Sequence, residues 1–418
     1  MAQLSGDSFA GGPALLPLDE AVRLLFARVP AVADVEAVLL ADADGRILAE
    51  PLIAPLDLPG FDNSAVDGYA VRFGDLAPDG ETVLAIAGRV AAGQAPAADP
   101  SHRTAIRIFT GAPMPAGFDT VFMQEDCRLN AEGAVVLPRG LSKGANARPK
   151  GEDVALGTPA LAAGLRLAPE SIALAAALGQ ASLGVRRRLR VAIFSTGDEI
   201  MAPGAPLRPA AIYDANRFFL IALLRRLGVV VTDLGILPDT EDAITRALEH
   251  AAPAHDLLLT SGGVSTGEED HVKAAVAKAG SLVFWRIAIK PGRPVALGVI
   301  QGTPFVGLPG NPVAVFVTFA AIVRPLLAAL AGETWMPPVA LPVTAAFAYR
   351  KKKGRREYVR VALSREPDGR LVAQKHPVEG AGVLTSLTET DGLVELGEDV
   401  VTVAPGDRVG FLSYAVLR

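Results

Sequence analysis

Cysteine is nearly absent from this chain of 418 residues, which holds only Cys127. One cysteine excludes an internal disulfide and a multi-cysteine metal site, and it is typical of a protein from a reducing compartment. Cys127 follows three polar residues, Gln124 to Asp126, with no obvious base nearby, so we do not expect it to act as a nucleophile. The five histidines lack metal-ligand spacing.

A net positive charge is also missing. The chain has 40 Lys and Arg against 45 Asp and Glu, a net charge of −5, which argues against nucleic acid as a partner. The basic runs at 186–190 and 351–356 are interpreted as solvated faces. The first twenty residues lack a cationic signal-peptide start. The longest apolar run, 312–331, contains Arg324 and Pro325, which favours a core helix over a membrane span. We therefore expect a cytoplasmic protein.

The length and the apolar content of 50% indicate a globular chain of two to four domains. Residues 18–50 are interpreted as helical, because Val22, Leu25 and Phe26 have helical spacing. Short β-like runs separated by Gly and Pro follow up to residue 139. A helix is predicted over 169–178.

Strands alternate with helices from residue 190 to residue 335, which predicts a parallel sheet covered by helices on both faces. One of these strands is predicted over 282–290. The fold class is thus multidomain α/β plus β. We expect a helical and linker domain (18–53 and 158–185, its first helix free to pack on the α/β domain), a β domain (54–157), a doubly wound α/β domain (186–335) and a small C-terminal β-barrel-like domain (336–418).

Four loops lie at the predicted carboxyl edge of the α/β sheet, where ligands bind in such folds. They are STGDEI (195–200), LPDTED (237–242), TSGGVSTGEEDH (260–271) and GLPGNP (307–312). Gly262 and Gly263 let main-chain amides approach an anion, and the helix that follows adds its positive dipole end. Asn311 before Pro312 is predicted to cap a helix and to offer further amides. These loops suit a phosphate group.

Carboxylates share the same edge: Asp198, Glu199, Asp239, Glu268 and Asp270. They would repel phosphate unless a cation intervened, and hard oxygen ligands around phosphate are the usual setting for Mg²⁺. Lys290 and Arg293, in AIKPGRP, would supply counter-charge for an oxyanion. Acidic residues at helix N-termini are often only dipole partners, and that reading is the default for Glu241 and Asp242.

A polar loop, PGFDNSAVDGYA, occupies residues 59–70. Such composition is usually a surface turn, and the alternative is a loop that presents carboxylates and amides to a ligand. Eight ordered segments decide between the two: DNSAVDGYA, IFTGAP, RPKGED, FSTGDE, IYDANR, TSGGVSTGEEDH, AIKPGRP and GLPGNPVA. From about Leu18 to its end, the chain resembles the molybdopterin molybdenumtransferases, the MoeA and gephyrin E-domain family.

The resemblance implies an enzyme that takes adenylylated molybdopterin and molybdate and releases AMP and molybdenum cofactor. Its implied catalytic residues are Asp67, Thr110, Glu199, Asp239 and Asp270, of which Asp239, Asp270 and Glu199 would hold Mg²⁺. Its implied substrate-binding residues are Asp153, Gly262, Gly263, Ser265, Lys290, Arg293, Pro309, Asn311, Pro312 and Arg360. Two positions depart from the family pattern: Arg293 replaces a frequent lysine, and Ala381 replaces a serine.

The resemblance also implies a homodimer whose site lies between the α/β domain of one subunit and the β domain of the other, with Asp67 directed into the partner's pocket. Contacts with the adenylyltransferase and with cofactor acceptor enzymes are further implied. Two other functions stay open. One is adenylyltransferase activity, and the other is a non-catalytic scaffold that keeps the fold. The sequence does not distinguish molybdate from tungstate.

Overall fold

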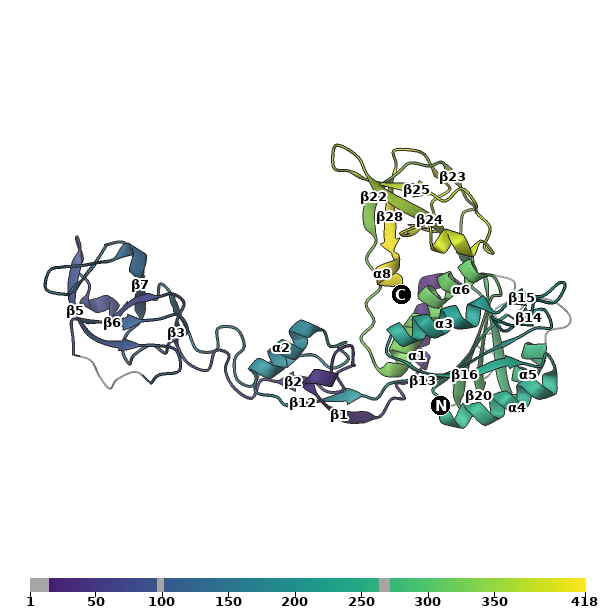
Figure 1. Cartoon of the computed structure of the whole chain (residues 1–418), viewed down its shortest axis with the longest axis horizontal. Coiled ribbons are helices and arrows are strands. Elements are labelled where there is room, and N and C mark those ends of the chain that lie inside the picture. The colour runs from purple at the N-terminus through teal and green to yellow at the C-terminus, as the bar shows by residue number, and fades with distance from the viewer. Residues whose placement is uncertain (1–14, 96–100, 263–270) are drawn as a thin grey trace.

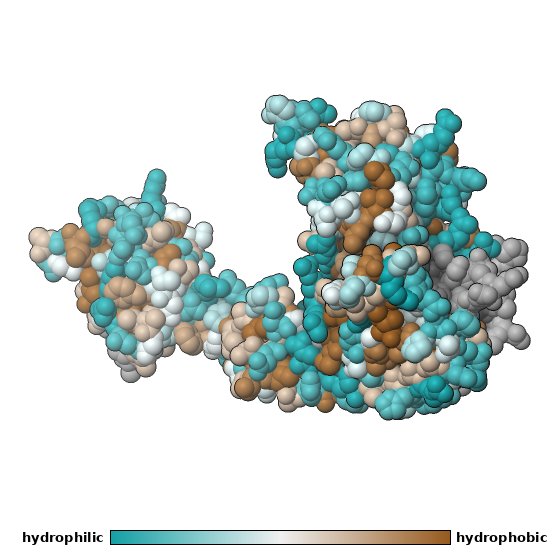
Figure 2. All heavy atoms as spheres, turned by 45° about the vertical axis from the view of Figure 1, so that its right-hand side comes forward, coloured by the Kyte–Doolittle hydropathy of each residue, from teal (hydrophilic) through white to brown (hydrophobic). Residues whose placement is uncertain are grey.

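The computed structural model describes residues 15–95, 101–262 and 271–418. Figure 1 shows an elongated molecule with a β domain at one end, a narrow middle region that carries α2 (Pro169–Ala177), and a larger part in which an α/β sheet lies below a C-terminal barrel. On the face shown in Figure 2, hydrophobic groups reach the surface in several separate patches.

The β domain is a twisted sheet of six strands in the order β7-β4-β6-β5-β9-β8. Its strands are β4 (Gly68–Val71), β5 (Thr82–Val90), β6 (Thr104–Ile108), β7 (Thr120–Met123), β8 (Arg128–Leu129) and β9 (Val135–Leu137). Successive side chains of a strand face opposite sides. Accordingly, Ala70 and Ile106 belong to one hydrophobic cluster, whereas Val71 and Ala105 belong to the other.

The middle region corrects the prediction of a helix over 18–50. The helix α1 (Leu18–Arg28) ends just before Pro30, and Val35–Leu39 forms strand β1, which pairs antiparallel with β12 (Ser182–Arg186). A second small pair joins β2 (Leu52–Ile53) to β11 (Pro159–Leu161). The strand partner of β1 is far away in sequence, so local periodicity could not reveal it. The helix predicted over 169–178 is present as α2.

The α/β sheet has six strands in the order β16-β13-β17-β21-β20-β18. Their bounds are β13 (Arg190–Thr196), β16 (Val230–Leu237), β17 (Leu257–Ser261), β18 (Gly280–Arg286), β20 (Pro294–Ile300) and β21 (Thr303–Leu308). The first four strands in the order are parallel, as predicted, but β20 runs antiparallel to β21, and the edge strand β18 runs antiparallel to β20. The reason is the two-residue turn at Gln301 and Gly302, both with positive φ, which only an antiparallel hairpin can use.

Helices cover both faces of this sheet. They are α3 (Ala215–Arg226), α4 (Glu241–Ala251), α5 (His271–Ala279), α6 (Pro312–Thr318) and α7 (Arg324–Ala331). Along β13, Val191 and Ile193 pack with α1, α3, α6 and α7, whereas Ala192 and Phe194 pack with α4 and α5. The doubly wound prediction is therefore confirmed. Residues 312–331 pass the length and hydropathy test for a membrane span, yet 83% of their most apolar window is buried in the protein, which confirms a core helix.

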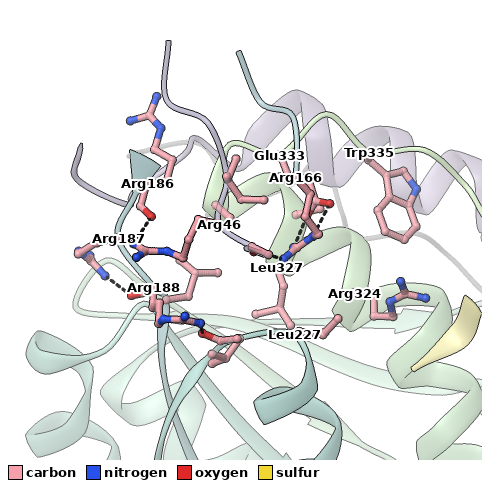
Figure 3. Close-up of a pocket in the computed structure, with 17 residues that line it drawn as sticks. Arg46, Arg166, Arg186, Arg187, Arg188, Leu227, Arg324, Leu327, Glu333 and Trp335 are labelled. Carbon is pink, nitrogen blue, oxygen red and sulfur yellow. Dashed lines mark hydrogen bonds and ion pairs between the residues drawn. The ribbon is translucent and has the colours of Figure 1, made fainter. Parts of the chain in front are cut away.

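An arginine-rich joint connects the middle region to the α/β domain (Figure 3). Arg166 donates two hydrogen bonds to Glu333 at 2.9 and 2.5 Å, and the Thr334 amide donates to the Gly164 carbonyl at 2.9 Å. Arg46 donates to the main-chain carbonyl of Arg186 at 2.8 Å. Within the basic run at 186–190, Arg187 donates to both carboxylate oxygens of Asp256 at 2.7 and 2.8 Å, and Arg186 donates to the Ala33 carbonyl at 3.1 Å, so the run is partly structural rather than a solvated face.

The C-terminal strands form a closed barrel of five strands, since β24 pairs with both β25 and β26. Its strands are β22 (Leu341–Ala345), β24 (Arg356–Arg365), β25 (Leu371–Lys375), β26 (Gly392–Leu396) and β28 (Arg408–Ser413), with β23 (Tyr349–Arg350) and β27 (Thr402–Val403) paired beside it and α8 (Tyr414–Leu417) at the end. The basic run at 351–356 is not simply solvated: Lys351 is buried and its ammonium donates to the Arg355 carbonyl at 2.6 Å.

The segment predicted as one strand over 282–290 is divided between two sheets. β18 ends at Arg286, and β19 (Ile289–Lys290) instead pairs in parallel with β24 of the barrel. Between them, the Ile287 amide donates to the Arg293 carbonyl and closes a turn. The division places Lys290 at the boundary between the α/β domain and the barrel.

Candidate active site

The carboxyl ends of β13 and β16 bring one predicted carboxylate into a defined position. Thr196, the last residue of β13, donates its hydroxyl hydrogen bond to Asp239 Oδ1 at 3.0 Å. The same hydroxyl lies 3.3 Å from the Leu237 carbonyl at the end of β16. Asp239 is half-buried at this edge. The two adjacent parallel strands therefore position the Asp239 carboxylate at the edge where the sheet topology predicts that a ligand binds.

Glu199 lies on the next turn of the same edge and is exposed. It follows Gly197, whose φ of +137° is one that side chains rarely adopt, and a Cβ at Gly197 would approach Glu199 Oε2 to 2.6 Å. Glycine at 197 thus lets the Glu199 side chain fold back against the main chain. The STGDEI turn is built to carry that carboxylate.

The GLPGNP loop reaches the same edge from β21. Asn216 Nδ2 on α3 donates to the Gly310 carbonyl at 2.7 Å, and the Gly262 amide donates to the Leu308 carbonyl at 3.0 Å. Asn311 occupies the cap position of α6, but its side chain makes no capping hydrogen bond. The Val313 amide is also taken, by the Ala381 carbonyl at 3.0 Å. The prediction of free amides there is wrong for Val313, because a barrel loop satisfies it.

A cavity of about 210 Å³ lies between the KPG segment of the α/β domain and the barrel. Its lining residues are Lys290, Pro291, Tyr349, Tyr358, Val359, Arg360, Lys375, His376, Glu379 and Ala381. Lys290 and Arg360, which are 70 residues apart in the sequence, therefore meet in one cavity. Ala381 lines the cavity and also binds the Val313 amide at the start of α6. The cavity thus adjoins the GLPGNP loop at the end of β21.

The cavity is strongly cationic. Arg360 is buried, and its guanidinium donates to the Gly380 carbonyl at 2.9 Å and to the Ser386 hydroxyl at 2.7 Å, with no carboxylate among the hydrogen-bond partners found in the described parts of the chain. Burial lowers the pKa of Arg360 from its usual value. An arginine remains charged even so, and a buried charge without a counter-ion favours an anionic ligand.

The Lys290 ammonium donates to Tyr349 at 3.3 Å and to Glu357 Oε2 at 3.2 Å. Burial acts to lower the pKa of Lys290, but the hydrogen bonds to Tyr349 and Glu357 outweigh it and leave the pKa above its usual value. Lys290 is therefore a permanent cation at neutral pH. Its side chain is about half exposed, at 49%, so the ammonium can also reach a ligand.

Asp67 and Thr110 form a second cluster, in the β domain. Asp67 Oδ1 accepts from both the amide and the hydroxyl of Thr110 at 2.8 Å. These bonds, the amide first, hold the pKa of Asp67 below its usual range, and the Arg107 guanidinium adds to the effect. Within one chain this cluster lies on the lobe at the far end of the molecule from Lys290 and Asp239 (Figure 1).

The other polar residues of the 59–70 loop have structural roles. Asn63 and Ser64 are buried in strand β3 (Asn63–Ser64), which pairs with β10 (Ala147–Arg148). Asp62 accepts from the Lys150 amide at 2.7 Å. Only Asp67 presents its carboxylate beside a second predicted site residue, so the loop combines a turn with a single functional side chain.

The remaining predicted residues are more scattered. Asp153 is exposed in the β domain, and Pro309 is buried behind the carboxyl edge. Arg293 is two residues past the cavity-lining Pro291 but is not among the residues that line the cavity. Gly263, Ser265 and Asp270 lie outside the described residues, as do Glu268 and the start of the helix expected after the glycines.

Sequence reasoning missed two groups that line the cavity, Tyr349 and Lys375, and the buried Glu357 that binds Lys290. All three lie on C-terminal strands that were interpreted only as structural, and Glu357 follows the basic run that was interpreted as a solvated face. A buried acid next to basic residues at a strand start was the available signal. Burial raises the pKa of the Cys127 thiol to about 11, which favours the protonated thiol at neutral pH.

The proposed Mg²⁺ ligands are only partly described. In the described ranges, no three His, Cys, Asp or Glu side chains converge on a metal-sized site, and Asp270 is outside these ranges. The donor chemistry at the edge, with the carboxylates of Asp239 and Glu199 and the hydroxyl of Thr196, consists of hard oxygens of the kind Mg²⁺ prefers. The residues present therefore fit Mg²⁺ by chemical type.

Three family profiles match the chain in order. They are the MoeA N-terminal region (domains I and II) over residues 16–179, a probable molybdopterin binding domain over 192–329, and the MoeA C-terminal region (domain IV) over 342–414. A molybdopterin molybdenumtransferase of Haemophilus influenzae is 39% identical over 94% of this chain and 98% of its own length. The chain belongs to the molybdopterin molybdenumtransferase family.

Further relatives of the molybdopterin molybdenumtransferase family agree. Molybdopterin molybdenumtransferase 2 of Mycobacterium tuberculosis is 36% identical over 88% of this chain and 93% of its own length. The crystal structure of a molybdopterin biosynthesis MoeA protein from Pyrococcus horikoshii superimposes with a TM-score of 0.81, at 29% identity, over 96% of this chain and 100% of that structure. The resemblance recognised from the ordered motifs is thereby confirmed across the length of the chain.

Proposed function

We propose that this chain is a molybdopterin molybdenumtransferase that inserts molybdate into adenylylated molybdopterin and releases AMP. One observation carries the proposal: Lys290 and Arg360, from two domains, line a single cationic cavity that adjoins the GLPGNP loop, at the edge of the sheet where the parallel strands end and where Asp239 also lies. A tetrahedral oxyanion fits the cavity by charge, and a phosphate-bearing ligand fits the edge with its oxygen donors. The names of the full-length relatives favour this function over adenylyltransferase activity or a scaffold.

Each group has a proposed task. Lys290 and Arg360 bind molybdate, and Asp239, Glu199 and Asp270 would hold Mg²⁺. Bound Mg²⁺ would neutralise charge on the phosphate oxygens. Water attacks the phosphorus on the molybdopterin side, the phosphoanhydride P–O bond breaks, and AMP leaves with the bonding electron pair. Molybdenum then forms two bonds to the dithiolene sulfurs, and one molybdate oxygen leaves as water with the two thiol protons. Positioning and charge compensation are the main contributions of the protein.

We also propose that the complete site needs two chains. Asp67 and Thr110 are held ready by two hydrogen bonds, yet they lie on a lobe remote from the cavity of the same chain (Figure 1). Large apolar side chains are exposed on β1 and near α3, including Leu39 at 62% and Phe218 at 48%, which suits burial in a homodimer. A dimer would let Asp67 of one subunit close the cavity of the other.

The first experiment measures AMP release from adenylylated molybdopterin by purified protein with Mg²⁺, with and without molybdate. Molybdate-dependent release that yields cofactor able to reconstitute a molybdoenzyme supports the transferase. ATP-dependent adenylylation instead would support the adenylyltransferase, and binding without turnover would support a scaffold. Repeating the assay with tungstate tests which oxyanion is preferred. The same preparation can be tested for contacts with the adenylyltransferase and an acceptor enzyme.

A second experiment tests the two-chain site. Asp67→Ala and Asp239→Asn chains, each inactive alone, are co-expressed with different tags. If the site forms across a dimer, about half of the dimers are mixed and one of their two sites is intact, so about a quarter of the wild-type activity returns. No recovery in isolated mixed dimers would contradict the arrangement. A cytoplasmic location is inferred in addition, from the single reduced cysteine.

A further inference from the structure

Glu357 is a buried acid beside the cationic cavity. It lies on β24, is 1% exposed, and its Oε2 accepts from the Tyr349 hydroxyl at 2.9 Å and from the Lys290 ammonium at 3.2 Å. Arg355 Nη2 lies 3.3 Å from Oε1, but in the described part of the chain no donor has hydrogen-bond geometry to that oxygen. Burial of a carboxylate costs free energy unless nearby cations and hydrogen-bond donors compensate its charge.

We propose that Glu357 is a positioning residue that, together with Tyr349, holds the Lys290 ammonium at the cavity and thereby strengthens the binding of a tetrahedral dianion such as molybdate. The inference rests on the proposed function, because it takes molybdate as the ligand of the cavity. It goes further by assigning a role to an acid that no sequence motif marked.

The connection between Glu357 and Lys290 is built into the main chain. Lys290 is the register partner of Glu357 where β19 joins β24, and the Arg356 amide donates to the Ala288 carbonyl at 2.8 Å. The barrel therefore fixes both ends of the ion pair. A lysine has a flexible four-carbon stem, so an unpaired Lys290 would occupy many rotamers.

The Lys290 ammonium keeps one N–H donor for the ligand. It has three N–H donors, of which one is directed to Tyr349 and one to Glu357. The third remains for an oxyanion, since half of the Lys290 side chain is exposed. Preorganisation of a charged donor raises affinity because less freedom is lost on binding.

Other charges around the cavity do not replace this pair. Lys375 is hydrogen-bonded to Glu379, and Arg360 is held by carbonyls and by Ser386. The charged and titratable groups that surround Lys290 are Tyr349, Arg355, Glu357, Tyr358, Arg360, Lys375, His376 and Glu379. Because Glu379 already compensates Lys375, the mobility of Lys290 depends on Glu357 and Tyr349.

A simple charge argument predicts the opposite effect. A carboxylate near an anion repels it, so removal of Glu357 by Glu357→Gln should tighten molybdate binding. The positioning role predicts weaker binding, because glutamine loses the charge-assisted bond to Lys290. The sign of the change in affinity therefore separates the two explanations.

The test is calorimetric titration of inorganic molybdate into the full-length protein, as wild type, Glu357→Gln and Asp368→Asn. Asp368 is the matched control, an exposed acid paired with Arg370 on the barrel surface. We expect about tenfold weaker binding for Glu357→Gln and no change for Asp368→Asn. If folded Glu357→Gln binds molybdate as tightly as the wild type or more tightly, the positioning role of Glu357 is wrong. The oxyanion cavity and the proposed function would still stand. Absence of binding by the wild type overturns the oxyanion cavity itself, and the inference with it.

A pH series distinguishes positioning from general damage. In the wild type, molybdate affinity should fall only as the pH rises beyond about 10.5, the ordinary pKa of lysine, because the pKa of Lys290 is raised, and this fall should begin at lower pH in Glu357→Gln. A merely structural role would weaken binding without moving the inflection. If Glu357→Gln does not fold, Tyr349→Phe replaces it and keeps the carboxylate: we expect about threefold weaker binding, and unchanged affinity would overturn the proposal.

Discussion

Replacement of Gly292 by alanine should damage the loop that carries Lys290. Gly292 has a φ of +103°, and a Cβ there would lie 2.3 Å from Thr318 Oγ1 and 3.2 Å from the Ala314 carbonyl oxygen. The backbone strain costs about 1–3 kcal/mol. The collision with fully buried Thr318 adds about 1–3 kcal/mol. Gly292→Ala should therefore lower the free energy of unfolding by about 2–6 kcal/mol.

A double-mutant cycle separates these two costs. Thr318→Ala removes the atom that collides and also the weak bond from its hydroxyl to the Gly292 carbonyl, at 3.4 Å, which costs about 1 kcal/mol by itself. Combining Thr318→Ala with Gly292→Ala should recover about 1–3 kcal/mol of unfolding free energy relative to the sum of the two single losses. The strain of the positive φ at residue 292 should remain. The coupling between the two sites is the measure of the collision.

The assay is thermal unfolding followed in parallel with molybdate titration. For a domain of the size of the α/β domain, each kcal/mol corresponds to about 2–4 °C in Tm. Molybdate affinity should fall with the single substitution, because Lys290 lies two residues away, and should partly recover in the double variant. A Gly292→Ala protein as stable as wild type, or a double variant without recovery, would refute the reasoning.

Three further predictions concern individual side chains. Asp239→Asn should keep the fold, because asparagine can still accept from Thr196, and should lose at least about 100-fold in AMP release; unchanged turnover would remove Asp239 as a metal ligand. Thr110→Ala removes one of the two bonds that lower the pKa of Asp67, so the loss of ionised Asp67 as pH falls should begin at higher pH, measured by NMR titration. Cys127 should resist alkylation at neutral pH and react faster only as the pH approaches about 11, because burial raises its pKa to about 11; rapid labelling at neutral pH would contradict this.

Some predictions succeeded because local pattern and tertiary environment agree. The apolar run of β13 supplies side chains to both faces of the sheet, as a buried parallel strand must. The helix at 312–331 was recognised as internal from Arg324 and Pro325, and most of it is buried. Its order of apolar residues alone could not have distinguished a core helix from a span.

Other predictions failed where a partner far away in sequence decides the structure. Val35–Leu39 was interpreted as helical but pairs with β12, more than a hundred residues later. Lys351 was interpreted as solvated, yet carbonyls of the barrel enclose its ammonium. In both cases the deciding contact is non-local, and helical or charge periodicity carries no information about it.

The sequence by itself determined the family, the alternation that builds the doubly wound sheet, and the residue types of the site, because ordered motifs and apolar spacing are local properties. Only the tertiary structure decided that Lys290 and Arg360 line one cavity, that Glu357 holds Lys290 from the barrel, and that Asp67 lies on a separate lobe. These relations depend on which segments pack together, and packing between distant segments is set by the whole fold rather than by any single stretch.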